Sequence, residues 1–375
     1  MTVNYSPFTH MADGTIKQIN PLLGTEVWTV PGRGNRPLDQ PQAMTDNHSC
    51  AFCWDRKRET PPEKARMLSD ATVLRHVPAA ELDATDPDFR RIPNLFEIVT
   101  FDYWHANYGM EADAELIDAY LAEDSGYDHV KSVVEAKLRR QLDGEDLKLA
   151  ARAFFSGSHD VIVARRHHGG SGSLSKDEHA RIIAFTIDAM RNLYEKNPYA
   201  KYVAAFQNWL KPAGASFDHL HKQLVAIDEH GPELRSVERV PNVFEERGIE
   251  LARKHDLIIA ENEHAVLFAG IGHPYPTLEV YSKAPGRPWE HSAAEVRGFS
   301  DVLHAAHRAI GAGVACNEEW HHQPRDVHIP MPWRVNLKLR TSTLAGFEGS
   351  THIYLNTISP WDLKEKVLAG LDNHR

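Results

Sequence analysis

Apolar and polar residues recur with two different periods along the chain, and these periods separate predicted strands from predicted helices. Short apolar runs are typical of buried strands, and strict alternation is typical of strands with one polar face. The strands expected on this basis are residues 27–30, 97–99, 160–164, 202–206, 219–226 and 333–340. Residues before Ile16 are polar and are expected to be irregular.

Helical spacing of apolar residues appears in several longer segments. The helices expected are residues 111–121, 129–142, 176–193, 250–255, 293–311 and a C-terminal one from Pro360. Two begin with a capping box, Ser175 with Glu178 and Ser292 with Glu295. Each half therefore holds strands, a capped helix and further strands, which predicts an α+β fold built from a duplicated unit. Polarity rises near residue 230, where we place a boundary between domains at 1–230 and 231–375.

Composition restricts the classes of function. The chain has 375 residues, 42% of them hydrophobic, and a formal net charge of −10. This balance supports a large core and gives no sign of general nucleic-acid affinity. Three cysteines are too few for a disulfide framework, and no apolar run is long enough to span a bilayer. We therefore expect a cytoplasmic protein without membrane segments.

The most informative segment is residues 213–226. It opens with a run of small residues that would allow a ligand close to the backbone. In a strand, alternate residues share a face, so His219, His221 and Gln223 would lie side by side. Two such histidines alone are weak evidence in a chain with 23 histidines.

Cys50 and Cys53 form a Cys-x-x-Cys pair, which can supply two thiolates to one tetrahedral zinc ion. A thioredoxin-like redox pair is the alternative, and it would require the cysteines at a helix N-terminus after a strand. Here the pair lies in a polar loop, which favours zinc.

Together these motifs resemble the galactose-1-phosphate uridylyltransferase family, the transferase branch of the histidine-triad superfamily. The likeness lies in Gly-Ala-Ser-x-x-His-x-His-x-Gln at 214–223, in Thr-Pro-Pro-Glu after the cysteine pair, in the strand at 160–164 with its trailing histidines, and in Ala-Gly-Phe-Glu at 345–348. The resemblance implies two histidine-triad-like repeats, each a mainly antiparallel sheet with packed helices. Residues 1–230 would be the catalytic and zinc-binding repeat, residues 231–375 a degenerate one, and the protein a homodimer.

The resemblance also assigns roles to residues. It implies a zinc ion (Zn²⁺) held by Cys50, Cys53, His168 and His219, although the neighbouring His167 leaves a one-residue slip open. Four protein ligands would make this ion structural. Contacts to a nucleotide sugar are implied for Arg33, Arg36, Asn94, Asn208, Ser216, Phe347 and Glu348. Pro332 and Arg334 stand where relatives often carry histidine, which argues against a second metal site.

The implied chemistry is nucleotidyl transfer, in which His221 attacks the α-phosphorus of a nucleotide sugar. Gln223 stands where histidine-triad hydrolases have a third histidine, and an amide can hydrogen-bond a phosphate oxygen but cannot carry a proton. This favours transfer to a sugar phosphate or phosphate. ADP-glucose phosphorylase, dinucleoside tetraphosphate phosphorylase, a nucleotide hydrolase and a catalytically silent zinc-stabilised binding protein are the alternatives. Leu220 and Lys222 depart from the family pattern, and Lys222 should point away from His221.

Overall fold

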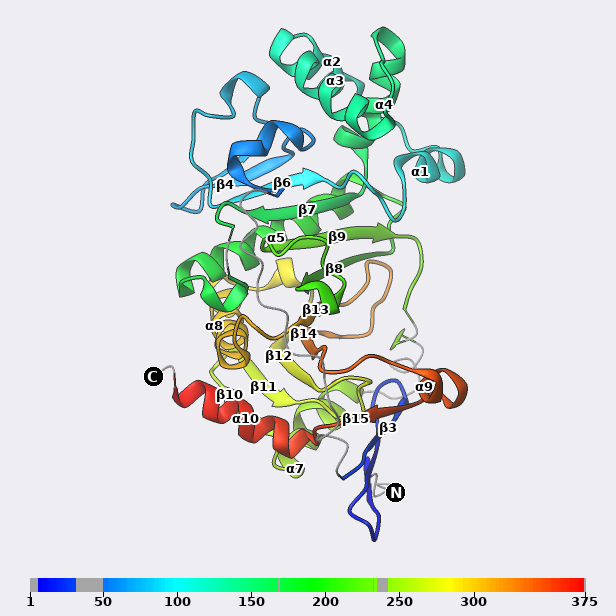
Figure 1. The fold of residues 1–375 in the computed structure, drawn as a ribbon, viewed down its shortest axis with the longest axis vertical. Coiled ribbons are helices and arrows are strands. Elements are labelled where there is room, and N and C mark those ends of the chain that lie inside the picture. Colours follow the sequence, from blue (N-terminus) through cyan, green and yellow to red (C-terminus); the bar gives the residue numbers. More distant parts are fainter. Residues whose placement is uncertain (1–5, 32–49, 168, 232, 235–241, 374–375) are drawn as a thin grey trace.

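The computed structural model describes residues 6–31, 50–167, 169–231, 233–234 and 242–373 (Figure 1). Within these residues, two sheets form. The larger has eleven strands in the order β10-β11-β12-β14-β13-β8-β9-β7-β6-β4-β5, and the smaller has the order β1-β2-β3-β15. None of the helices described is both long and apolar enough to cross a membrane.

The strands are β1 Phe8–His10, β2 Ile16–Ile19, β3 Glu26–Thr29, β4 Ala65–Met67, β5 Val73–Arg75, β6 Phe89–Pro93, β7 His159–Ala164, β8 Tyr202–Trp209, β9 His221–Ile227, β10 Ile258–Glu261, β11 Ala265–Ala269, β12 Thr277–Pro285, β13 Cys316–His321, β14 Pro332–Leu339 and β15 Ile353–Asn356. The helices are α1 Phe101–Tyr108, α2 Ala114–Leu121, α3 Asp124–Leu138, α4 Gly144–Ser156, α5 Lys176–Lys196, α7 Glu250–Lys254, α8 Ala293–Ile310, α9 Gly346–Thr351 and α10 Pro360–Asp372.

The two halves of the chain repeat one arrangement within the large sheet. In the first half the order is β7, α5, β8 and β9, and in the second it is β12, α8, β13 and β14. β8 and β13 pair with each other in antiparallel fashion, and each is flanked by the strand that follows it in the chain. The predicted α+β fold with duplicated units is confirmed. One sheet runs through both halves, and the domain boundary near residue 230 stays a prediction.

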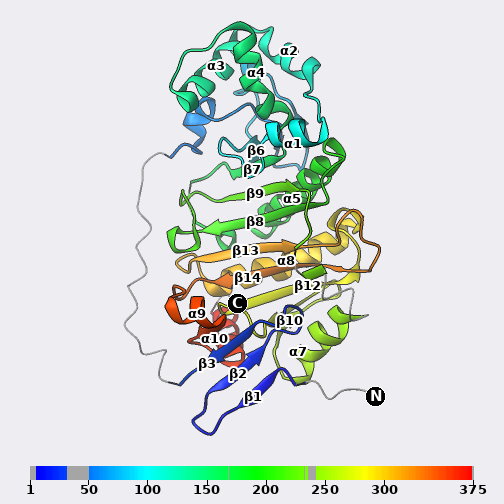
Figure 2. The same cartoon turned by 90° about the vertical axis from the view of Figure 1, so that its right-hand side faces the viewer.

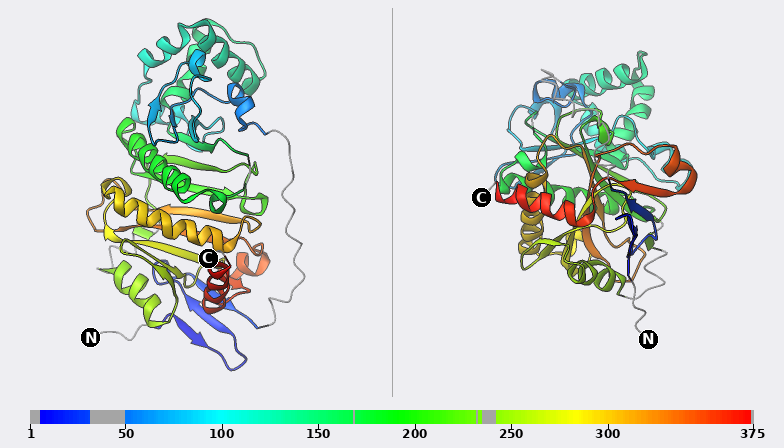
Figure 3. Two further views of the ribbon diagram at one scale, coloured as in Figure 1. Left: turned by 90° about the vertical axis from the view of Figure 1, so that its left-hand side faces the viewer. Right: turned by 60° about the horizontal axis from the view of Figure 1, so that its bottom comes forward.

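The helices α5 and α8 cover one face of the large sheet. They lie behind the strands in Figure 2 and in front of them in the left view of Figure 3. Both begin with the predicted capping boxes, in which Ser175 and Ser292 accept hydrogen bonds from Glu178 N–H and Glu295 N–H at 3.2 and 3.3 Å. Their apolar stripes pack on the sheet and form the main core. The opposite face of the central strands is therefore the one left for a ligand.

Some predicted elements were wrong. Residues before Ile16 include β1, which pairs with β2, although they were expected to be irregular. Residues 97–99 form no strand, and the strand of this region is β6, which ends at Pro93. The helices predicted at 111–121 and 129–142 have other bounds in the structure, as α2 and α3, and α1 and α4 lie beside them at one end of the molecule (Figure 1).

Candidate active site and metal centre

The strand β9 presents two chemically different faces. Across its pairing with β7, His221 lies opposite Val163 and Gln223 opposite Val161. Residues directly opposite each other in a sheet share a face, so these four side chains lie on the face away from α5. Leu224 and Ala226 belong to the core under the helices. The predicted side-by-side placement of His221 and Gln223 therefore follows from the register, whereas His219 lies just before the strand begins.

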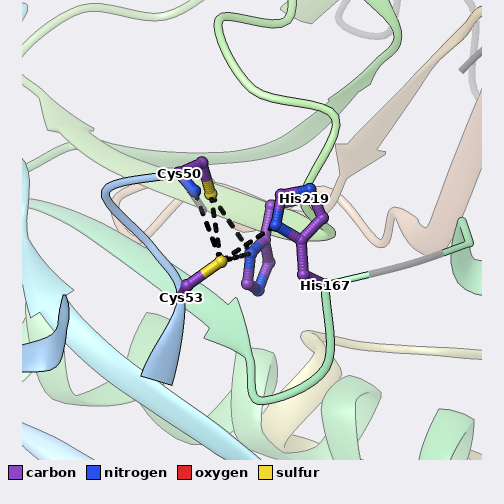
Figure 4. Close-up of side chains that lie close together, drawn as sticks. All are labelled: Cys50, Cys53, His167 and His219. Atoms are coloured by element: carbon purple, nitrogen blue, oxygen red, sulfur yellow. Dashed lines mark hydrogen bonds between the residues drawn. The ribbon is translucent and has the colours of Figure 1, made fainter. Parts of the chain in front are cut away.

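Four side chains from distant parts of the chain meet beside the start of β9. Cys50, Cys53, His167 and His219 bring their ligand atoms within 4.8 Å of one another (Figure 4). Cys53 Sγ lies 2.9 Å from His167 Nδ1, and Cys50 Sγ lies 3.4 Å from His219 Nδ1. The two sulfurs are 3.9 Å apart. The group could hold a metal ion.

The donor set fits zinc in its chemistry. Tetrahedral zinc with bonds of about 2.3 Å to sulfur and about 2.0 Å to nitrogen places its ligand atoms roughly 3.3–3.8 Å apart. The contacts here range from 2.9 Å to at most 4.8 Å around that spacing. The second ring nitrogen of His219 donates to Ala164 O at 2.6 Å, which turns Nδ1 toward the cysteines. Burial lowers the pKa of His219 to about 4, so its ring is neutral and able to ligate.

One predicted ligand differs from the residue found in this group. His168 was expected there from the register of the strand at 160–164, but it lies outside the described residues. The histidine that the structure places against Cys53 is His167, the neighbour that the sequence left open. β7 ends at Ala164, so the alternation of the strand no longer fixes which way the following side chains point.

His221 is held in one tautomer. Its Nδ1–H donates to the carbonyl oxygen of His219 at 2.7 Å, which leaves the lone pair on Nε2. Burial lowers the pKa of His221, so the ring is neutral. The centroid of the Phe52 ring lies 5.2 Å from that of His221. Phe52 stands between Cys50 and Cys53 in the sequence. Within the part of the chain that the structure describes, no hydrogen bond occupies Nε2 of His221. A neutral imidazole of this kind is suited to nucleophilic attack.

An apolar patch lies next to His221 on the same face. Ile92, Val161 and Val163 form a small cluster separate from the main core, and Phe52 packs against it. The ring of Phe217 lies 4.9 Å from that of Phe52 and continues the patch into the loop before His219. The three aliphatic side chains are buried, whereas the rings of Phe52 and Phe217 are partly exposed beside the nucleophile.

Gln223 belongs to a polar group at the other side of the patch. Its Oε1 lies 3.1 Å from His159 Nε2 and 3.3 Å from Asn94 Nδ2. The predicted substrate residue Asn94 is thus placed beside Gln223. His159 was missed from the sequence because the strand was expected to begin one residue later. His159 lies two positions before Val161, and residues two apart in a strand share a face. This spacing could have placed His159 on the same face as Val161.

Lys222 points away from His221, as the alternation predicts. Its Nζ is buried and lies 2.5 Å from Glu318 Oε1 and 3.0 Å from Gln207 Oε1, so the contact joins β9 to β8 and β13. His307 Nε2 and Trp320 Nε1 complete the partners of Glu318. Burial pushes the pKa of Glu318 upward, but Lys222 and His307 bring it below its ordinary value.

Breaking this buried pair should destabilise the protein strongly. Lys222→Met would leave Glu318 without its main counter-charge, and such losses cost about 3–5 kcal/mol. We expect the free energy of unfolding in urea to fall by this order. The double variant Lys222→Met/Glu318→Leu should recover part of it, because no lone charge then stays buried. A matched change at the exposed pair of Lys148 with Asp118 should have little effect. Equal stability of Lys222→Met and wild type would contradict this role.

The other predicted residues are placed as follows. Asn208 accepts from Asn317 Nδ2 at 2.8 Å, and its amide lies near Gly214, whose positive φ of 86° starts the small-residue loop. Ser216 is exposed in that loop. Phe347 lies on α9 and faces Trp28 at 6.4 Å, and Glu348 caps the same helix. Among the contacts of the described residues, none joins these two to His221.

Three arginines named in the sequence analysis remain to be placed. Arg33 and Arg36 lie outside the described residues, so their contact with phosphate stays a prediction. Arg334, which stands where relatives often carry histidine, is buried, forms an ion pair with Glu233 and packs over the ring of Phe244 at 4.6 Å.

The fold and these motifs resemble those of the galactose-1-phosphate uridylyltransferase family, and comparison with known proteins confirms this predicted resemblance. The chain belongs to the family described as "Domain of unknown function (DUF4921)", which it matches over residues 11–375. A curated relative, the ADP-glucose phosphorylase of Arabidopsis thaliana, is 24% identical over 362 residues, covering 90% of this chain and 89% of its own.

Solved structures agree on the fold. An ADP-glucose phosphorylase from Arabidopsis thaliana with bound ADP-glucose matches with a TM-score of 0.66 at 20% identity, over 94% of this chain and 98% of that one. A uridylyltransferase matches with a TM-score of 0.50 at 19% identity, over 59% of this chain and 77% of that one. The relatives named are enzymes that act on nucleotide sugars or transfer uridylyl groups.

Proposed function

We propose that this protein is a nucleotidyltransferase that moves a nucleoside monophosphate from a nucleotide sugar to a phosphate acceptor through His221. The observation that carries the proposal is the neutral ring of His221, which donates from Nδ1 and so has its lone pair on Nε2, beside Gln223 on the same strand face. ADP-glucose is the first donor to test, because the curated relative that matches along most of the chain is an ADP-glucose phosphorylase.

The reaction would proceed in two displacements. Nε2 of His221 attacks the α-phosphorus, and the bond from that phosphorus to the bridging oxygen breaks as the sugar 1-phosphate leaves. The departing phosphate ester is a stable anion and needs no proton from the enzyme. An oxygen of the acceptor then attacks the same phosphorus, which frees His221. With inorganic phosphate as acceptor and ADP-glucose as donor, the products are ADP and glucose 1-phosphate.

The side chains around His221 suit these steps. The amide of Gln223 would donate to a phosphoryl oxygen, and it cannot relay a proton to water. The partly exposed rings of Phe52 and Phe217, which lie 4.9 Å apart, would hold the nucleobase. A zinc ion bound by Cys50, Cys53, His167 and His219 would have four protein ligands. It would hold the loop that contains the two cysteines against the start of β9. Arg33, Arg36 and Ser216 remain proposed contacts of the diphosphate, and Phe347 and Glu348 of the sugar.

The test separates transfer, hydrolysis and simple binding. Purified protein is incubated with ADP-glucose labelled in the adenylate, and UDP-glucose serves as a second donor. Without phosphate, a transferase should release glucose 1-phosphate in near-stoichiometric amount and retain acid-labile, base-stable label. Addition of phosphate should discharge the label as nucleoside diphosphate with ping-pong kinetics. Continuous release of AMP without phosphate would instead indicate a hydrolase, and no release with either donor would reject the proposal for these substrates.

A further inference from the structure

The segment that follows β6 fixes two side chains through its backbone. The N–H of Ile98 donates to Nδ1 of His159 at 3.1 Å, and the N–H of Phe96 donates to Oδ1 of Asn94 at 2.8 Å. His159 is buried, and burial lowers its pKa, so its ring is neutral. A neutral ring that accepts at Nδ1 carries its proton on Nε2. An amide that accepts at its oxygen likewise presents its NH₂ group elsewhere.

Both donors converge on one oxygen atom. His159 Nε2 lies 3.1 Å and Asn94 Nδ2 lies 3.3 Å from Oε1 of Gln223. His159 Nε2 and Asn94 Nδ2 lie 3.1 Å apart, because both donors approach the same acceptor oxygen. Two donors on Oε1 define the orientation of the Gln223 amide, because the flipped amide would set its NH₂ against both of them. The NH₂ of Gln223 is therefore the end left for a ligand.

This orientation decides how Gln223 acts on a phosphoryl group. An NH₂ group directed at the reacting phosphate donates to an oxygen on which negative charge increases during transfer. The reverse orientation would direct a carbonyl oxygen at that charge and repel it. A free amide would adopt both orientations, so the constraint has a direct effect on the rate.

We propose that His159 is a positioning residue that, together with Asn94, locks the amide of Gln223 with its NH₂ toward the transferred phosphoryl group. The inference rests on the proposed nucleotidyl transfer and adds to it a residue that never touches the substrate. His159 acts only through Gln223, and this separates it from a residue that merely stabilises the fold.

The experiment is a double-mutant cycle on the rate constant for labelling of the enzyme by adenylate-labelled ADP-glucose in a single turnover. Gln223→Ala should slow labelling by about 10- to 100-fold, the effect of losing one hydrogen bond to a charged group. His159→Leu should slow labelling by a smaller factor, because Asn94 still donates to Oε1 of Gln223. The double variant His159→Leu/Gln223→Ala should be no slower than Gln223→Ala alone, because the two residues act as one unit. His159→Gln, whose terminal NH₂ reaches a position similar to Nε2, should recover most of the rate.

The control is His304→Leu, which removes a buried and hydrogen-bonded histidine from α8 on the helix side of the sheet. It should lower the melting temperature as His159→Leu does while labelling proceeds at the wild-type rate. Multiplicative effects in the double variant, or labelling of His159→Leu at the wild-type rate, would overturn the inference and leave the proposed function standing. Absence of label on the wild-type protein with ADP-glucose and UDP-glucose would reject the proposed function and the inference with it.

Discussion

Replacing His221 with alanine is expected to abolish nucleotidyl transfer while the protein stays folded. The side chain provides the only nucleophile in the proposed mechanism, and loss of a nucleophile lowers turnover by several orders of magnitude, roughly 10⁴-fold or more. His221 donates a hydrogen bond to His219 O within its own segment and contacts Phe52, so its removal leaves the metal group with all four of its ligands. Zinc content and circular dichroism should therefore match those of the wild type.

The measurement is covalent label on the protein after incubation with adenylate-labelled ADP-glucose, together with turnover in the presence of phosphate. Peptide mapping should place the wild-type label on His221 and on no other histidine. His10→Ala, a change at an exposed position of β1, is the control and should be labelled fully. Undiminished turnover by His221→Ala with any donor would end the mechanism proposed here.

Replacing Cys53 with serine is expected to remove the metal and to destabilise the fold at the same time. Its sulfur lies within 2.9–4.0 Å of a ligand atom from each of the other three members of the group. Serine is a poor zinc ligand, and structural zinc contributes several kcal/mol to folding. We expect about one zinc per chain in the wild type, far less in Cys53→Ser, and a melting temperature lower by on the order of 5–10 °C.

Cys316→Ser is the matched control. Cys316 is also buried, but it lies on β13 and is not part of the group of four. This variant should keep its zinc even where its melting temperature falls. Metal analysis of the two variants therefore distinguishes loss of a ligand from loss of a buried thiol. Full zinc retention by Cys53→Ser would remove the Cys-x-x-Cys pair from the metal site and favour the redox alternative.

Local patterns predicted the parts of the structure that depend on local rules. The capping boxes at Ser175 and Ser292 and the direction of Lys222 away from His221 follow from spacing along one helix or strand, and the structure has all three. The positions that failed depend on contacts between distant segments. Residues 97–99 have the composition of a strand, but the N–H of Ile98 is taken by the ring of His159 instead of a neighbouring strand.

The same reasoning explains the metal ligand and the buried charge. The turn after β7, and not the alternation of the strand, determines the direction of the His167 side chain. The contact of His167 with Cys53 depends on a distant part of the chain, so it could not be predicted locally. Glu318, nearly a hundred positions from Lys222 in the chain, gives no sign in its local sequence that it will neutralise a lysine inside the protein. Tertiary contacts of this kind cannot be read from periodicity.

The small sheet imposes an order on the biosynthesis of this protein. β3 pairs in parallel with β15, with Val27 opposite Tyr354, so β3 meets this partner only after the chain has been synthesised as far as Ile353 and beyond. Until then the edge of β3 that faces away from β2 is unpaired. Unpaired strand edges are surfaces on which nascent chains associate. Premature termination before Ile353 would leave that edge open permanently, even in a chain that already contains every residue of the metal group and both His221 and Gln223.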